Sequence, residues 1–212
     1  MSDGLHLGNV ISSNGKYDYI RKSVIDLYTR YNILSSRFSF CYPDLRYQLF
    51  KTYCVVPYGS QLWDFSNSSV AQYFTAWRKC VRKLWGLSPR THGYLLPGIC
   101  DDNVIEQQLH NRSLNFVRSC LHSTNSVLRI CINRALNGSH SAISNTMAFL
   151  RHRYYLSSES LFMKSTSCIR EAFRTRPEEQ RISQIRDFAI TRHSSNGEDM
   201  IVLDEILEFL CT

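Results

Sequence analysis

Hydrophobic residues recur at helical spacing along most of the chain, and the clearest pattern runs from Val70 to Leu84. One face of that segment would carry Val70, Phe74, Trp77, Val81 and Leu84, widened by Tyr73, Cys80 and Trp85. The other side would carry two basic pairs at i, i+4 spacing, made by Arg78, Lys79, Arg82 and Lys83. Gly86 stands where a helix C-cap is expected. The pattern predicts an amphipathic helix with an aromatic face and a cationic face.

The charge of this segment is one-sided. No Asp or Glu occurs between Asp64 and Asp101, and a basic loop with Arg90 and His92 follows the helix. Solvent-facing helices usually mix charges of both signs, because oppositely charged pairs at i, i+4 stabilise them. Two interpretations stay open on the pattern alone: the solvated face of a core helix, or a surface that binds an anionic partner.

The remaining periodicity predicts further helices after one short strand. The apolar run Leu5–Ile11 ends at the turn-forming residues 12–15 and is expected to be that strand. Helices are expected over residues 18–35, 43–56, 101–121, 126–136, 142–152, 158–174, 177–192 and 199–210. The buried stripe of the second helix is expected to consist of Leu45, Leu49, Tyr53 and Val56. The fold class is therefore predicted to be mainly α.

A break in the helical pattern falls at residues 95–98, where Leu-Leu-Pro-Gly interrupts it. This break predicts a boundary between two subdomains. Residues 1–98 would hold the N-terminal strand and the first helices, and residues 99–212 would form a second helical subdomain.

Composition and charge narrow the class of protein. The chain has 212 residues, of which 43% are hydrophobic and 12% aromatic, so it can bury a substantial core. Its formal net charge is +7 and its pI is about 9.0. A basic balance of this size favours an anionic partner, and nucleic acid is the commonest one.

Eight cysteines are expected to be reduced, small core residues and not a disulfide framework. No CxxC motif occurs, and the N-terminal residues lack the basic and apolar regions of a signal peptide. Cys54, Cys80, Cys120 and Cys131 fall on apolar helix faces. Cys120 and His122 are close in sequence, but no second pair completes a zinc site. An intracellular protein of the nucleus or cytoplasm is expected, neither secreted nor membrane-spanning.

The search for catalytic motifs finds no glycine-rich phosphate loop, no HExxH and no GxSxG. Asp101 and Asp102 are adjacent, but a helix-start pattern follows them at once, which indicates a helix N-cap in place of a metal site. A surface or capping role is expected for the scattered histidines, which are His92, His110, His122, His140, His152 and His193. No catalytic residue, metal ligand or cofactor is predicted.

Several segments together resemble one family in order and content. They are residues 6–11, 49–54, 58–63, 76–79, 84–87, 90–92, 95–97, 112–116 and 123–127. The first resembles the "LG" strand that forms the primer grip in non-LTR retrotransposon (LINE-type) reverse transcriptases. The segment from Ala76 to Pro97 resembles the tryptophan- and arginine-rich motif of the thumb that follows in that family. The likeness covers about residues 5–160.

The resemblance implies a thumb and C-terminal region that holds an RNA/DNA template–primer duplex beside a polymerase palm. In the family the metal-binding aspartates precede the primer-grip strand, so it implies that the catalytic palm is absent and that this chain alone performs no catalysis. Leu7 and Gly8 would approach the primer end. The expected phosphate contacts are Arg78, Lys79, Arg82 and Lys83, extended by Arg90 and His92. The alternatives are a helical protein-interaction module or a decayed, non-functional fragment of an element.

Overall fold

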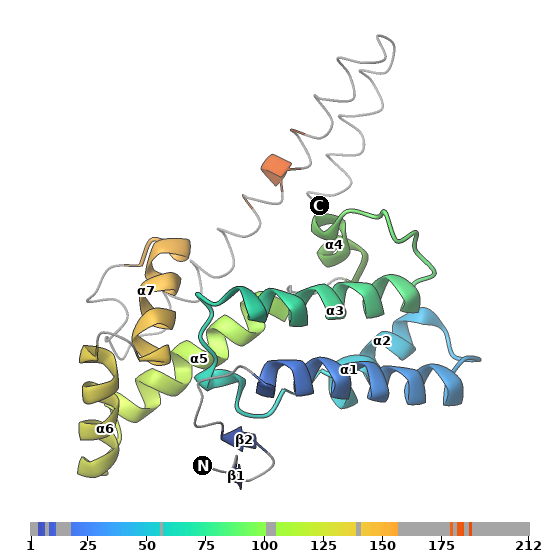
Figure 1. Cartoon of the computed structure of the whole chain (residues 1–212). Coiled ribbons are helices and arrows are strands. Elements are labelled where there is room, and N and C mark those ends of the chain that lie inside the picture. Colours follow the sequence, from blue (N-terminus) through green and yellow to red (C-terminus); the bar gives the residue numbers. More distant parts are fainter. Residues whose placement is uncertain are drawn as a thin grey trace.

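Helices make up most of the part of the chain that the structure, a computed structural model, describes (Figure 1). The described residues are 4–6, 9–11, 18–55, 57–100, 105–138 and 141–156, with residues 179, 182–184 and 187. The α-helices are α1 (Asp18–Arg37), α2 (Pro43–Tyr53), α3 (Ser68–Leu84), α4 (Leu96–Cys100), α5 (Ile105–Leu121), α6 (Ser126–Asn137) and α7 (Ala142–Tyr154). Two 3-10 helices are η1 (Ser60–Leu62) and η2 (Gly93–Leu95). The predicted mainly α fold is confirmed.

The N-terminal segment differs from its prediction. In place of one strand, two three-residue strands, β1 (Gly4–His6) and β2 (Asn9–Ile11), pair antiparallel. The register pairs Leu5 with Val10 and His6 with Asn9. Leu7 and Gly8 lie outside the described residues, as do Asp101 and Asp102. The helices predicted after residue 157 also lie outside them, apart from the few residues named above.

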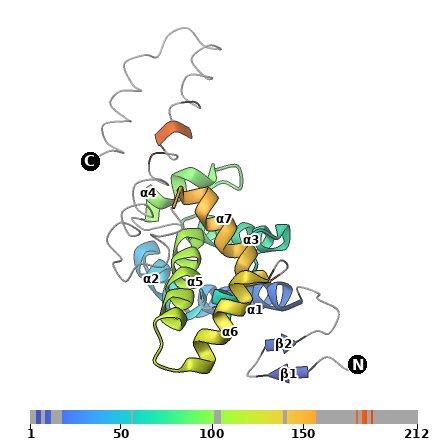
Figure 2. The ribbon, with the colours of Figure 1, turned by 90° about the vertical axis from the view of Figure 1, so that its left-hand side faces the viewer.

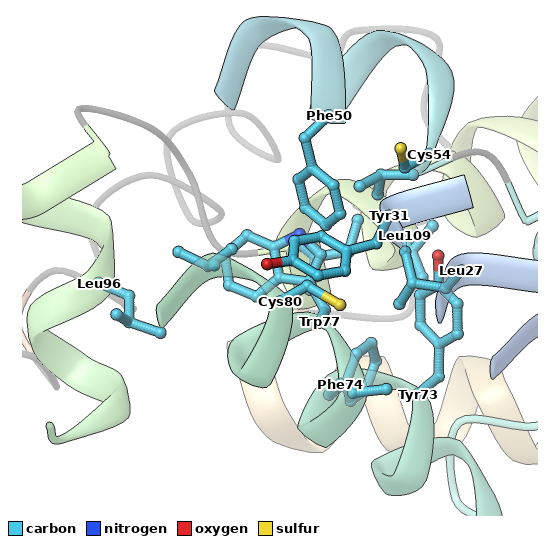
Figure 3. Close-up of a cluster of buried hydrophobic side chains, with 14 of the residues drawn as sticks. Leu27, Tyr31, Phe50, Cys54, Tyr73, Phe74, Trp77, Cys80, Leu96 and Leu109 are labelled. Carbon is cyan, nitrogen blue, oxygen red and sulfur yellow. The ribbon is translucent and has the colours of Figure 1, made fainter. Parts of the chain in front are cut away.

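The predicted aromatic face of α3 is confirmed as the centre of the larger hydrophobic cluster. Seven of the eight residues of that face are buried, and the eighth, Trp85, is half-buried. The helix lies alongside α1, and α2 packs against both (Figure 1). Figure 3 shows Phe50 from α2 and Trp77 and Cys80 from α3 pointing into this cluster. The rings of Tyr31 on α1 and Phe50 meet edge-on, with their centroids 6.2 Å apart.

The predicted buried stripe of α2 is wrong except at Leu49, which is half-buried and packs against the larger cluster. Leu45 and Tyr53 are exposed, Val56 is outside the described residues, and Tyr47 and Phe50 are the buried positions. The two aromatic side chains face α1 and α3, where Phe50 meets Tyr31 and Tyr47 meets Trp85. Burying these larger rings removes more apolar surface from water than burying leucine would, so tertiary packing selects their face.

The buried residues form two hydrophobic clusters that meet within α5, and the division into subdomains near residue 98 stays a prediction. The larger cluster contains Leu96 and Cys100 and continues as far as Leu109. The smaller one begins at Leu114 and is completed by α6 and α7. The half-buried Phe149 packs against both clusters. The core therefore runs through the Leu-Leu-Pro-Gly break, because η2 and α4 fold that segment back onto α3.

Helix α7 is attached to the loop that precedes α3. The buried Thr146 hydroxyl donates to the Trp63 carbonyl at 2.7 Å and accepts from the Phe65 amide at 3.1 Å. Asn145 donates to the Asp64 carboxylate at 2.9 Å. Figure 2 views the molecule from the side that α5, α6 and α7 form. These contacts fix the start of α3, which carries the predicted site.

Candidate nucleic-acid interface

Local capping signals set both ends of α3. Before the helix, the Asn67 side chain accepts a hydrogen bond from the Ser69 amide at 2.8 Å. At the other end, the Leu87 amide donates to the Arg82 carbonyl at 2.8 Å and the Gly86 amide to the Lys83 carbonyl at 3.3 Å. This pair of bonds is a Schellman motif, and it requires the positive φ of 63° that Gly86 adopts. The predicted C-cap is confirmed.

The four basic residues of α3 divide into two kinds. Lys79 and Lys83 are exposed, whereas Arg78 and Arg82 are half-buried and make contacts within the fold. Within the described part of the chain, no ion pair joins either lysine to a carboxylate. The carboxylates between residues 19 and 156 whose side chains are described are Asp26, Asp44, Asp64 and Glu106.

Arg78 links three elements. Its guanidinium forms an ion pair with Glu106 of α5 at 2.8 Å, and Glu106 also lies 3.7 Å from Arg153 of α7. The stem of Arg78 packs against Gly93, where an added Cβ would come within 3.0 Å of its Cδ. The expectation of an uncompensated cationic side is therefore wrong at this position, because α5 supplies an acid from outside the segment.

Arg82 holds the loop that follows the helix. Its Nε donates to the Thr91 carbonyl at 2.8 Å. Burial, with the positive charge of Arg78 as the second cause, lowers the pKa of Arg82, although an arginine remains charged. Because Thr91 is tethered in this way, its neighbours Arg90 and His92 stay beside α3.

Arg90 and His92 are both exposed, as predicted for phosphate contacts. The Arg90 amide donates to the Ser88 hydroxyl at 3.2 Å, and no ion pair is described for the Arg90 side chain within the resolved ranges. The His92 ring stacks on Tyr94, with centroids 5.1 Å apart and planes 20° apart. We refer to Lys79, Lys83, Arg90 and His92 as the exposed basic group.

A metal-binding cluster and a membrane-spanning helix are both absent from the described residues. Among the described residues, no three His, Cys, Asp or Glu side chains gather closely enough to hold a metal ion. Cys120 is buried, with its thiol pKa raised by burial, whereas His122 is exposed. No helix in the described ranges has both the length and the apolar composition needed to cross a membrane.

The cysteines follow their predicted faces with one exception. Cys54, Cys80 and Cys120 are buried, but Cys131 on α6 is exposed. Burial raises the pKa of Cys54 to about 11 and that of Cys80 to about 12, with nearby Arg30 and Lys83 opposing the shifts. Since the thiolate is the reactive form, the two buried thiols are chemically inert near neutral pH.

His110 departs from the surface role that the sequence suggested. It is 2% exposed, and its Nδ1 lies 2.8 Å from the Tyr154 hydroxyl. Aromatic rings surround it, the nearest being Phe65, whose centroid is 4.7 Å away. Burial, assisted by the positive charge of Arg153, lowers the pKa of His110 to about 3. The signal that sequence reasoning missed is its i, i+4, i+7 register with the buried Leu114 and Val117.

Comparisons with protein-family models, with curated proteins and with solved structures find no match to this chain.

Proposed function

We propose that this chain is a helical nucleic-acid-binding segment, similar to the thumb of a non-LTR retrotransposon reverse transcriptase, that holds an RNA/DNA template–primer duplex by its backbone. The proposal rests on the motif between Ala76 and Pro97 and on the exposed basic group that the same segment carries. Catalysis is assigned to a polymerase palm outside this chain. Of the surface features, the exposed Lys79, Lys83 and Arg90 support it most directly, and none of them forms an ion pair within the described residues.

The chemistry of this group suits backbone binding. Phosphate contacts by lysine and arginine orient a protein on a duplex and carry little sequence information. A-form helices, which RNA-containing duplexes adopt, are recognised mainly by shape and backbone. Lys79 and Lys83 lie one helical turn apart, and Arg90 extends the positive surface beyond the end of α3.

Arg78 and Arg82 are not proposed to contact phosphate. Their guanidinium groups bind Glu106 and the Thr91 carbonyl, so they are assigned to positioning the loop and not to phosphate. The proposed phosphate contacts are accordingly Lys79, Lys83, Arg90 and His92. Substitution of the two arginines and substitution of the two lysines should therefore affect different properties of the protein.

The test is a binding titration with duplex DNA, RNA/DNA hybrid and single strands over a series of salt concentrations. Lys79→Gln with Lys83→Gln should weaken binding to all sequences about equally. The slope of log K against log salt should flatten by about 0.9 for each lost contact on duplex DNA. Because Gln is nearly as good a helix former as Lys, the helix content should not change.

The matched control removes two arginines from α6, which lies at the opposite end of the molecule from the loop after α3 (Figure 1). Arg129→Gln with Arg134→Gln changes the net charge by the same amount but leaves the exposed basic group intact. If both double variants flatten the salt slope equally, only general charge attracts nucleic acid. If neither variant changes affinity or slope, the proposed interface is wrong.

A protein-interaction module is the second candidate, and a specific patch favours it. At the turn between α1 and α2, Phe40 and Tyr42 are 83% and 84% exposed, and the nearby Phe38 and Leu45 are exposed as well. Exposed apolar patches commonly mark docking surfaces. Absence of nucleic-acid binding at low salt would favour this candidate over the first.

A further inference from the structure

The turn between α1 and α2 exposes a cluster of aromatic side chains. Phe38, Phe40 and Tyr42 are all exposed, and the last two are exposed over most of their surface. The rings of Phe38 and Phe40 lie with their centroids 6.4 Å apart. We refer to these three residues as the aromatic turn. Exposed apolar side chains that cluster in this way commonly mark a binding surface, whereas single ones do not.

The aromatic turn is attached to the end of α3. The backbone amide of Arg46 donates to the Tyr42 carbonyl at 3.0 Å, and its guanidinium donates to the Leu84 carbonyl at 3.1 Å. The rings of Tyr47 and Trp85 meet beside this bond, with their centroids 6.4 Å apart. Figure 1 shows the turn and the end of α3 at the same end of the molecule. The aromatic turn therefore continues the surface that carries the exposed basic group.

Positive charge outweighs negative charge on this surface. Arg37 is exposed in the last turn of α1, and Lys83 and Arg90 are exposed at the end of α3 and in the loop after it. Asp44 is the only Asp or Glu between residues 27 and 63. It lies in the first turn of α2, where a carboxylate stabilises the N-terminus of the helix. A partner that fits this surface would be anionic and would offer flat apolar faces to the rings.

We infer, resting on the proposed function, that the aromatic turn stacks unpaired bases of a single strand that continues from the bound duplex. Every base has an aromatic face, so stacking on protein rings tolerates any sequence, while basic side chains nearby hold the phosphates. Phe40 and Tyr42 would supply the stacking faces, and Arg37 would contact the phosphates beside them. Paired bases fit less well, because they already stack on one another. The substrate is therefore a duplex with a single-stranded extension.

The test compares the binding of three RNA/DNA hybrid duplexes to the full-length protein. One duplex is blunt, and the other two carry a 5′ or a 3′ overhang of about six unpaired nucleotides, within the usual range of single-strand sites. One base of each overhang is 2-aminopurine. One of the two overhangs should raise the affinity roughly tenfold for each stacked base. The fluorescence of its 2-aminopurine should fall on binding, because stacking quenches it.

Two sets of variants assign that gain to the rings. Phe40→Ala with Tyr42→Ala should abolish both the gain and the quenching and leave the affinity for the blunt duplex unchanged. Phe40→Leu with Tyr42→Leu keeps apolar side chains and should lose most of the gain as well, because leucine has no ring. The matched control, Tyr53→Ala with Tyr58→Ala, removes two exposed rings from beyond the other end of α2 and should leave the gain intact.

The outcomes distinguish this inference from the proposed function. If the blunt duplex binds but neither overhang raises the affinity, the inference is wrong and the proposed function stands. If the gain survives Phe40→Ala with Tyr42→Ala, the single strand lies elsewhere on the protein. If that variant weakens binding of blunt and extended duplexes equally, the turn contacts the duplex itself. If no nucleic acid binds at low salt, both ideas are wrong and the aromatic turn suits a protein partner. Each of these four results overturns the inference.

Discussion

The stability of this fold is expected to fall at acid pH, because His110 is buried in an apolar environment. The imidazole is enclosed by Phe65, Phe74, Phe149 and Tyr154, with Nδ1 hydrogen-bonded to the Tyr154 hydroxyl. No hydrogen-bond partner within the described residues is present for its Nε2, which is buried. Protonation would place a charge in this apolar enclosure, so burial lowers the pKa from its ordinary value of 6.5 to about 3.

The size of the effect follows from the two pKa values. Between pH 6.5 and pH 3 the unfolded chain binds a proton at His110 that the folded chain does not bind, so stability falls as the pH falls. Each pH unit well inside that window is worth about 1.4 kcal/mol. Allowing for gradual titration near pH 6.5, the loss between pH 7 and pH 5 is about 2 kcal/mol. That is a large share of the roughly 5–15 kcal/mol typical of domains.

The assay is urea unfolding followed by circular dichroism at several pH values, on the natural chain and on His110→Gln. Glutamine does not titrate and retains a group that can bond to the Tyr154 hydroxyl. The variant should be less stable at pH 7, because a poorer fit in the aromatic enclosure loses contacts. The difference in the free energy of unfolding between the natural chain and His110→Gln should then shrink by about 2 kcal/mol between pH 7 and pH 5. Carboxylate titrations affect both proteins and cancel from the difference.

His122→Gln is the control for removing an imidazole, because His122 is exposed. If His122→Gln removed the loss of stability between pH 7 and pH 5 as fully as His110→Gln does, the effect could not be assigned to His110. The argument fails if the gap between the natural chain and His110→Gln stays constant from pH 7 to pH 5. That result would mean that the folded protein protonates His110 as readily as the unfolded chain does.

Three further substitutions have effects on the free energy of unfolding that the structure predicts. Gly86→Ala should cost roughly 1–2 kcal/mol, because the positive φ strains any residue with a Cβ. Thr146→Val should cost about 2 kcal/mol or more, since it leaves the buried Trp63 carbonyl and Phe65 amide without their hydroxyl partner. Trp77→Ala should cost roughly 3–5 kcal/mol through the cavity it leaves. Urea unfolding at pH 7 measures all three.

Each of these has a matched variant. Gly86→Asn should cost less than Gly86→Ala, because asparagine tolerates the left-handed conformation, and equal costs would contradict the backbone explanation. Thr146→Ser keeps the hydroxyl and should retain most of the stability that Thr146→Val loses. Trp77→Phe keeps much of the ring and should be milder than Trp77→Ala. If Trp77→Ala left stability unchanged, the buried position of that ring would be wrong.

The helices could be predicted from sequence where local signals were sufficient. The ends of α3 depend on Asn67 and Gly86, which act within a few residues of the helix itself. The face of α2 could not be predicted in the same way. Leucine and tyrosine occur on both sides of that helix, and its orientation depends on Tyr31 and Trp85 from other elements. Periodicity describes a helix, but the partner decides which side of it is buried.

The pair of N-terminal strands and the buried His110 are two further features that the sequence pattern did not reveal. The apolar run Leu5–Ile11 predicts one strand, whereas its described residues belong to two strands that pair antiparallel. His110 was assigned by the usual exposure of its residue type, although its helical register with Leu114 indicated the core. In both cases the specific position decides the structure against the general preference of the residue type. The register of a polar residue among buried ones is therefore informative even for a single histidine.

The basic residues of α3 show why binding is harder to predict than fold. Arg78 and Lys79 are adjacent in sequence and stand about 100° apart on a helical wheel, but the helix alone does not show which of them is paired. They differ because Glu106, 28 residues after Arg78, is brought to one of them by the packing of α5. A joint substitution of all four basic residues would therefore mix lost phosphate contacts with a loosened loop. Arg78→Gln should lower the free energy of unfolding and leave the salt slope of binding unchanged. Lys79→Gln should leave the free energy of unfolding unchanged and flatten the salt slope.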